Sequence, residues 1–115
     1  MYNPTVDPTG QDADQRAVRA CELLRRHFGA RAQVVARAPG RLELFGAHTD
    51  YNEGFVVAMA IGQAAVVAAA ARDDGRVRAV SDQEAEPAEL SLPAIAAGPQ
   101  GRWSDYLAGV IALLA

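Results

Sequence analysis

The chain has 115 residues, the length of one domain. Half of the residues are hydrophobic and 22% are charged, so the chain has the material for a packed core. The net charge of −3 argues against general binding to nucleic acids or anionic membranes, because both need clustered positive charge. All 11 basic residues are arginine, which rules out a catalytic or phosphate-binding lysine within the chain.

Features that would place the chain outside the cytoplasm are not apparent. One cysteine, Cys21, excludes an internal disulfide and a cysteine-based metal cluster. The first residues lack the basic start and apolar run of a signal peptide. Residues 55–71 come closest to a membrane span, but Gly62 and Gln63 interrupt them and they are slightly short. We therefore expect a cytoplasmic protein.

The first expected elements are a loose tail over residues 1–12 and a helix from Asp14 to Phe28. Apolar side chains recur along this helix at helical spacing, with Asp12 or Asp14 as the N-cap and Gly29 as the stop. Cys21 lies on the apolar side, so we expect an inert, buried thiol. Residues 13–115 form the expected domain.

Strands are expected next. Residues 33–38 and 41–45 read as two strands separated by a turn at Pro39 and Gly40, and residues 55–61 read as a third. Residues 64–72 are ambiguous, because their alanines favour a helix. Asp73, Asp74 and Gly75 form a hairpin signal before an alternating run over residues 76–81, so we choose a strand paired with that run.

The rest of the chain is expected to be irregular and then helical. Residues 83–100 contain three prolines, with room for a short strand over residues 90–92. From Trp103 to Ala115, apolar side chains line one broad helical face. This helix lacks a C-cap and a basic last turn, from which we expect the chain to be a piece of a longer protein.

A polar loop, residues 46–54, carries most of the functional information. It packs directional hydrogen-bonding groups between two glycines, an arrangement suited to a small polar molecule such as a sugar. The carboxylate of Asp50 can accept hydrogen bonds from vicinal hydroxyls, His48 can donate or accept, and Arg41 can orient an anion. The alternatives are that Asp50 caps its own backbone in an Asx-turn, that His48 and Asp50 hold a metal, and that Arg41 forms a surface ion pair.

Residues 39–54, Pro-Gly-Arg-Leu-Glu-Leu-Phe-Gly-Ala-His-Thr-Asp-Tyr-Asn-Glu-Gly, resemble the galactokinase signature of the GHMP small-molecule kinases. The likeness extends to residues 55–61, to the turn at residues 72–78 and to the Arg-Trp-Ser-Asp-Tyr run that starts at Arg102. It implies an α+β fold, the N-terminal domain of a GHMP kinase (ribosomal protein S5 domain 2-like), with a truncated mixed sheet packed against helices.

The resemblance also implies roles for individual residues. Arg41 would orient the catalytic carboxylate and stabilise charge during transfer, and Asp50 and His48 would bind the sugar. Trp103 and Tyr106 resemble residues that flank adenine, although from the pattern they read as core residues. The implied reaction transfers the γ-phosphoryl group of ATP to the C1 hydroxyl of galactose or a related sugar, with Mg²⁺. The phosphate loop, the catalytic aspartate and the Mg²⁺ ligands would lie in the remaining C-terminal part, so we expect the 115 residues by themselves to be inactive.

Two positions depart from the family pattern. The family glutamate beside the histidine is Ala47 here, and the family asparagine in the preceding strand is Glu43, which shares a face with Arg41 and could pair with it. Both changes predict a shifted or broader sugar range. Two other classes stay open: a non-catalytic regulator that senses sugar and ATP, and a structural α/β module in which the loop is only a turn.

Overall fold

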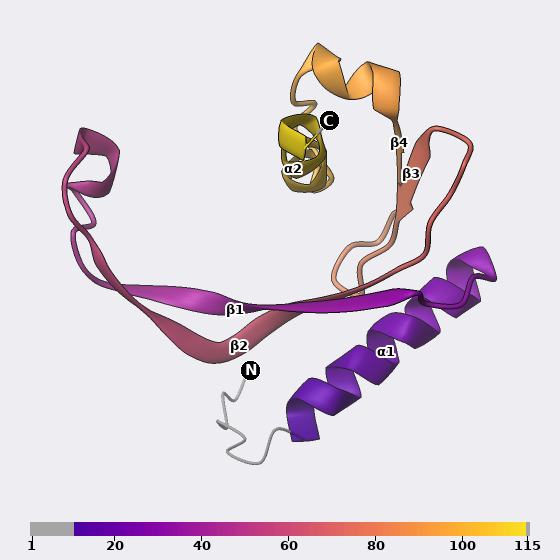
Figure 1. Ribbon diagram of the computed structural model, residues 1–115, viewed down its shortest axis with the longest axis horizontal. Coiled ribbons are helices and arrows are strands. Elements are labelled where there is room, and N and C mark those ends of the chain that lie inside the picture. The colour runs from indigo at the N-terminus through magenta and orange to yellow at the C-terminus, as the bar shows by residue number, and fades with distance from the viewer. Residues whose placement is uncertain (1–10, 115) are drawn as a thin grey trace.

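The computed structural model describes residues 11–114. Two long strands, β1 (Val34–Phe45) and β2 (Val57–Ala69), form an antiparallel ribbon, and helix α1 (Gln11–Phe28) lies along one end of it. A second antiparallel pair joins β3 (Arg76–Ala79) and β4 (Ala88–Ser91). The 3-10 helix η2 (Leu92–Ala97) and helix α2 (Asp105–Leu114) follow (Figure 1). The expected α+β composition is confirmed, whereas both described sheets are antiparallel and two-stranded rather than parts of one mixed sheet.

Strand β1 runs without a turn through Pro39 and Gly40, so the expected turn there is wrong. The cross-strand partners jump from Pro39–Ala64 to Arg41–Ala60, which places Gly40 opposite residues 61–63 of β2. A Cβ atom at Gly40 would lie 3.0 Å from the Ile61 side chain. The absence of that Cβ lets the extra residues of β2 bulge towards β1, and the strand continues instead of turning.

Two arginines satisfy backbone carbonyls around the bulge. Arg16 Nη1 of α1 donates to the carbonyl oxygen of Ala64 at 3.1 Å. The cross-strand neighbour of Ala64 is Pro39, which has no N–H to donate. Arg37 Nη2 donates to the carbonyl oxygen of Gly62 at 3.4 Å. The arginines thus replace ladder hydrogen bonds that the bulge and the proline remove.

Residues 64–69 are a strand and not a helix, as the context of the sequence predicted. Along this half of β2, half-buried residues (Ala64, Val66, Ala68) alternate with exposed ones (Ala65, Val67, Ala69). Helix α1 packs against β2, and Ala17, Cys21, Leu24 and Phe28 on its apolar face are also half-buried. The strand assignment is therefore fixed by a one-sided contact with α1, which the alanine content did not reveal.

Helix α1 ends where the sequence predicted but begins earlier. Gly29 has φ +66°, and its N–H donates to the carbonyl oxygen of Arg25, which is the expected glycine stop. The expected caps, Asp12 and Asp14, both lie inside the helix, after its first residue. Cys21 is half-buried rather than fully buried. The other residues of the expected tail, 1–10, lie outside the described part of the chain, as does Ala115.

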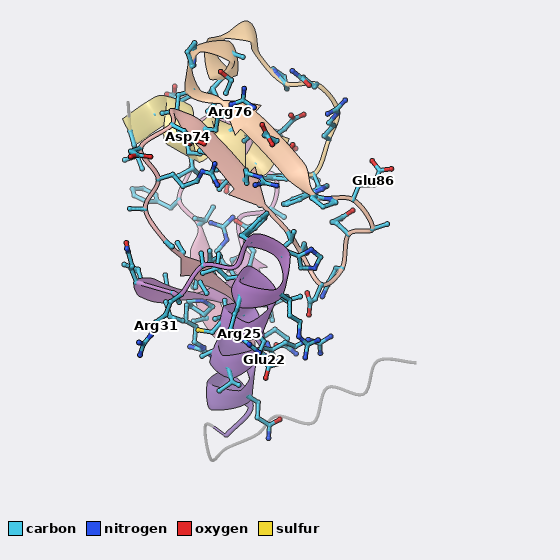
Figure 2. All side chains as sticks on the ribbon, turned by 90° about the vertical axis from the view of Figure 1, so that its right-hand side faces the viewer. Glu22, Arg25, Arg31, Asp74, Arg76 and Glu86 are labelled. Carbon is cyan, nitrogen blue, oxygen red and sulfur yellow. The ribbon has the colours of Figure 1, made fainter. Side chains whose placement is uncertain are left out.

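Strand β3 does not pair with β2, so the expected hairpin partner is wrong. Its partner is β4, with Val77 opposite Leu90, and the short strand expected near residues 90–92 lies at Ala88–Ser91. The turn at residues 73–75 still forms. Asp74 Oδ1 accepts hydrogen bonds from Arg72 Nε (3.0 Å) and from the N–H of Arg76 (3.2 Å). Figure 2 shows Asp74 and Arg76 side by side at this strand pair.

Helix α2 begins at Asp105, two residues later than expected. One carboxylate oxygen of Asp105 accepts the N–H groups of Gln100, Gly101 and Arg102 at 2.7–3.1 Å, so the three residues before Trp103 fold around it. Hydrogen bonding, first of all from Gln100, lowers the pKa of Asp105. Most of the expected apolar face is open to solvent, with Tyr106 87% and Leu113 89% exposed. No described helix has the length and apolar character needed to cross a bilayer.

No apolar residue among those described is buried, and Ser104 is the one side chain that is. The chain exposes 9376 Å², whereas a compact protein of 12.1 kDa exposes about 6000 Å². Its radius of gyration is 16.7 Å, against about 13 Å for a compact domain of this length. The two strands of the ribbon are therefore held by backbone pairing. Helix α1 contacts β2, and α2 contacts η2, through partly exposed side chains rather than through a closed core.

The turn at Asp74 gives a testable prediction. The hydrogen bond from Arg72 lowers the pKa of Asp74 from 3.8 to about 2. Because the folded pKa is depressed, the stabilisation is complete above pH 3.8 and is lost as the pH falls towards 2. Arg72→Ala should raise the pKa of Asp74 towards 3.8, measured by NMR titration of the side-chain carboxyl carbon. Arg31→Ala, remote from this turn, is the matched control; an equal shift in both variants would contradict the assignment.

Candidate sugar-binding site

The polar loop, residues 46–54, lies at the end of the β1–β2 ribbon that is remote from α1 (Figure 1). Gly46 opens it with φ +107°, a conformation that favours glycine. A Cβ atom there would lie 2.8 Å from the carbonyl oxygen of Phe55 and from the Val56 side chain. The Gly46 carbonyl oxygen accepts the N–H groups of Thr49 and Asp50 at 3.0 and 2.9 Å. The first turn of the loop therefore requires glycine at position 46, because any side chain would clash there.

Thr49 closes the loop on itself. Its hydroxyl lies 3.1 Å from the Gly46 carbonyl oxygen and 3.0 Å from that of Phe55, so it joins the two ends of the loop. Its own carbonyl oxygen accepts the N–H groups of Asn52 and Gly54. A Cβ atom at Gly54 would lie 2.5 Å from the Thr49 Cβ. The sequence pattern did not single out Thr49. Its position between the two glycines is the one feature of the sequence that could have indicated a role in closing the loop.

His48 is held from two sides within the loop. Its Nδ1 lies 2.9 Å from the hydroxyl of Tyr51, and the two rings meet edge to face. Its carbonyl oxygen accepts a 2.8 Å hydrogen bond from Asn52 Nδ2. These contacts use Nδ1 and leave Nε2 as the ring nitrogen available to a ligand. Tyr51 and Asn52 are thus positioning residues that the sequence pattern did not single out.

Asp50 starts a short 3-10 helix, η1 (Asp50–Asn52), and its side chain is exposed. Within residues 11–114 its carboxylate accepts no hydrogen bond and forms no ion pair. It therefore does not cap its own backbone, and the Asx-turn alternative is wrong for this residue. The loop is shaped by its glycines, Thr49 and Asn52, which leaves the carboxylate of Asp50 available to a ligand.

Arg41 and Glu43 lie on β1 just before the loop, with Ala60 and Ala58 as their cross-strand partners. Directly opposed residues share a face of an antiparallel pair, so both charged side chains stand on one face beside two alanines. Within the described residues, no ion pair joins them, and neither makes a hydrogen bond. The expected Arg41–Glu43 pair and the alternative of a surface ion pair at Arg41 are both wrong in this structure.

Tyr106 lies in α2 and Trp103 lies two residues before the start of that helix, and Figure 1 shows α2 apart from the polar loop. Trp103 donates from Nε1 to the carbonyl oxygen of Glu86 at 3.3 Å and lines an open cleft of about 520 Å³ formed by β4, η2 and the start of α2. Tyr106 is exposed and does not line this cleft. The structure thus places neither residue beside Asp50, and it does not bring the two together around one slot.

No group of three His, Cys, Asp or Glu side chains within residues 11–114 is arranged to hold a metal. His48 and Asp50 have no third candidate ligand beside them there, so the metal alternative for this pair has no support. The loop instead presents hydrogen-bonding groups of both kinds. The carboxylate of Asp50 is an acceptor and the guanidinium of Arg41 is a donor, and neither is paired among the described residues. Such a set is suited to a polyhydroxylated ligand.

A strand, a glycine-bounded polar loop and a return strand form the candidate site, and the same part of the chain is similar to known proteins. Residues 22–71 match the family model described as the galactokinase galactose-binding signature. The chain is 44% identical to a galactokinase of Streptomyces coelicolor over 91 residues, which are 78% of this chain and 24% of that protein. It is 45% identical to a galactokinase of Chloroflexus aggregans over 85 residues, 74% of this chain and 22% of that protein.

The resemblance to galactokinases is therefore confirmed over part of their length. The chain carries the galactose-binding signature, and it spans about a quarter of the length of the curated relatives it matches. The matched residues include the whole β1–β2 ribbon and the polar loop, together with the end of α1.

The loop geometry predicts that position 46 tolerates only glycine. Gly46→Ala should destabilise the full-length protein by about 1–3 kcal/mol and weaken sugar binding, because it adds left-handed strain and a clash. Gly62→Ala is the matched control, since a Cβ atom there meets nothing within 4 Å. Thermal unfolding and calorimetric sugar titration measure both effects. Equal behaviour of the two variants would show that Gly46 does not shape the loop.

Proposed function

We propose that this chain is the sugar-binding part of a galactokinase-like sugar kinase. The full-length protein transfers the γ-phosphoryl group of ATP to the C1 hydroxyl of galactose or a related sugar. The observation that carries the proposal is the polar loop, whose own hydrogen bonds fix its shape and do not use the carboxylate of Asp50, which has no partner in the described part of the chain. The match to the galactose-binding signature supports the same assignment.

The proposed roles follow from the chemistry of each group. Asp50 accepts hydrogen bonds from ring hydroxyls, and charge-assisted bonds of this kind contribute about 1.5–3 kcal/mol each. His48 offers Nε2 to the same ring, since Tyr51 occupies Nδ1. Arg41 supplies a fixed positive charge near the reacting hydroxyl. Phosphoryl transfer depends on positioning and on charge neutralisation, and an unpaired guanidinium is suited to both.

The described residues do not form a glycine-rich phosphate loop. The described glycines lie at turns, at the bulge and in α2 rather than in one phosphate-binding loop at the start of a helix. None of the described residues is therefore assigned to hold Mg²⁺ or the phosphates of ATP. The assignment of Trp103 and Tyr106 to an adenine pocket stays a proposal, and Trp103, which lines the cleft beside α2, is the better placed of the two.

The first test removes the charge of the proposed sugar ligand. Asp50→Asn in the full-length protein should weaken sugar binding on the order of 10- to 100-fold, because it loses a charge-assisted acceptor of similar shape. Calorimetric titration with galactose and related sugars, in the presence of a nonhydrolysable ATP analogue, measures this loss. Asp73→Asn, at the turn before β3, is the control. Unchanged sugar affinity in Asp50→Asn, or no sugar binding by the wild type, would contradict the proposed function.

The second test addresses which sugar is bound. Ala47 is exposed and precedes His48 in the loop, at the position where the family pattern has a glutamate. We propose that its lack of a carboxylate shifts or broadens the sugar range. Ala47→Glu should raise kcat/KM for galactose relative to sugars altered at C6 by roughly tenfold, the value of one added hydrogen bond. A wild type that already prefers galactose strongly, or a variant with unchanged selectivity, would refute the shift.

A further inference from the structure

Glu43 has an environment that the loop residues do not explain. Its Oε1 atom is buried and has no hydrogen-bond donor, and the residue as a whole is half-buried. Oε2 also lacks a donor and is not among the buried atoms, so it faces accessible space. Burying a carboxylate oxygen without a hydrogen-bond donor costs free energy. A ligand that donates a hydrogen bond to this carboxylate would recover part of that cost.

The residues that face Glu43 and Arg41 across the strand pair are small. The cross-strand partner of Glu43 is Ala58, and the partner of Arg41 on the same face is Ala60. These alanines add little bulk beside the two long charged side chains. The larger apolar side chains Leu42 and Met59, which are also cross-strand partners, stand on the opposite face.

Arg41 supplies the second half of the arrangement. Its guanidinium has no acceptor within residues 11–114, and it lies two residues from Glu43 on the same strand face, about 7 Å along the strand. A hydroxyl group can donate its hydrogen to a carboxylate while its oxygen accepts from a guanidinium. The two side chains stand on the same strand face, so one ligand hydroxyl can be offered to both.

We infer that Glu43 is a specificity-determining sugar ligand. It accepts the hydrogen of one sugar hydroxyl whose oxygen is held by Arg41. This inference rests on the proposed sugar kinase function and adds a binding residue outside the polar loop. A carboxylate only accepts hydrogen bonds, so Glu43 selects a sugar that presents a hydroxyl at this position against one that lacks it.

The test couples changes in the protein to changes in the sugar. In the full-length protein, the affinities of the preferred sugar and of each of its single-deoxy analogues are measured by calorimetry with a nonhydrolysable ATP analogue. The wild type should bind one analogue at least tenfold more weakly than the parent sugar because the bridging hydroxyl is missing. In Glu43→Ala, affinity for the parent sugar should fall about 10- to 100-fold, and discrimination against that analogue should disappear.

Two further variants keep the outcome interpretable. Glu43→Gln preserves the shape and one acceptor, so it should lose less affinity than Glu43→Ala and keep part of the discrimination. Glu22→Gln, on the exposed face of α1 labelled in Figure 2, should change neither quantity. Circular dichroism and thermal unfolding of each variant establish that the compared proteins are folded. If Glu43→Ala does not fold, the Glu43→Gln result decides.

The results separate this inference from the proposed function. A wild type that binds and phosphorylates a sugar, with Glu43 variants that keep its full discrimination among deoxy analogues, overturns the role of Glu43 and leaves the kinase assignment standing. Equal weakening of all analogues in Glu43→Ala also overturns it, because that pattern indicates a structural role. A wild type that binds no sugar overturns both.

Discussion

The antiparallel pairing of β1 with β2 is the interaction on which the rest of this structure depends. Apolar burial holds most small domains together, but here no described apolar residue is fully buried. The ribbon must therefore keep its register through backbone hydrogen bonds, and arginine side chains complete the carbonyls at the bulge. That register fixes the positions of the polar loop, Arg41 and Glu43. Large apolar surfaces on both the ribbon and α2 are left for contacts that these residues do not make among themselves.

The candidate site separates residues that hold shape from residues that meet a ligand. Gly46, Thr49 and Gly54 use their hydrogen bonds and their lack of bulk to close the loop. Among the described residues, the carboxylate of Asp50 and the guanidinium of Arg41 have no partner. Polar groups that a protein leaves unpaired beside a rigid backbone are the groups that a ligand can pair at little cost in reorganisation. This division supports sugar binding more strongly than the residue types do.

The sequence predicted the local elements better than their partners. The end of α1 at Gly29 and the turn at residues 73–75 follow from local signals that hold in the structure. Residues 64–69 are the strand that their context predicted, although their alanines favoured a helix. The bulge at Gly40 was read as a turn because a Pro-Gly pair has the same local preferences in both settings, and only the opposing strand distinguishes them. The partner of β3 could not be read locally either, since an alternating pattern specifies a face and not a neighbour.

At the candidate site, the sequence identified the polar loop and Asp50. It did not identify the hydrogen bonds that fix the shape of the loop. The roles of Thr49, Tyr51 and Asn52 depend on contacts three to six residues apart in a non-repeating conformation, which has no periodic signature. Nothing in the sequence indicated that Arg41 and Glu43 do not form an ion pair. Neighbouring opposite charges suggest an ion pair, but the side-chain geometry decides whether it forms.

The bulge at Gly40 has a consequence for how this segment can vary in length. Side chains on a strand alternate between faces, so adding or deleting one residue between the bulge and Phe45 would turn Arg41 and Glu43 towards the face that carries Leu42 and Met59. The connection between β3 and β4, residues 80–87, has no such constraint, because it lies outside the strand ladder. Relatives that share this site should therefore keep the spacing from Gly40 to Gly54 fixed and differ in length near residues 80–87.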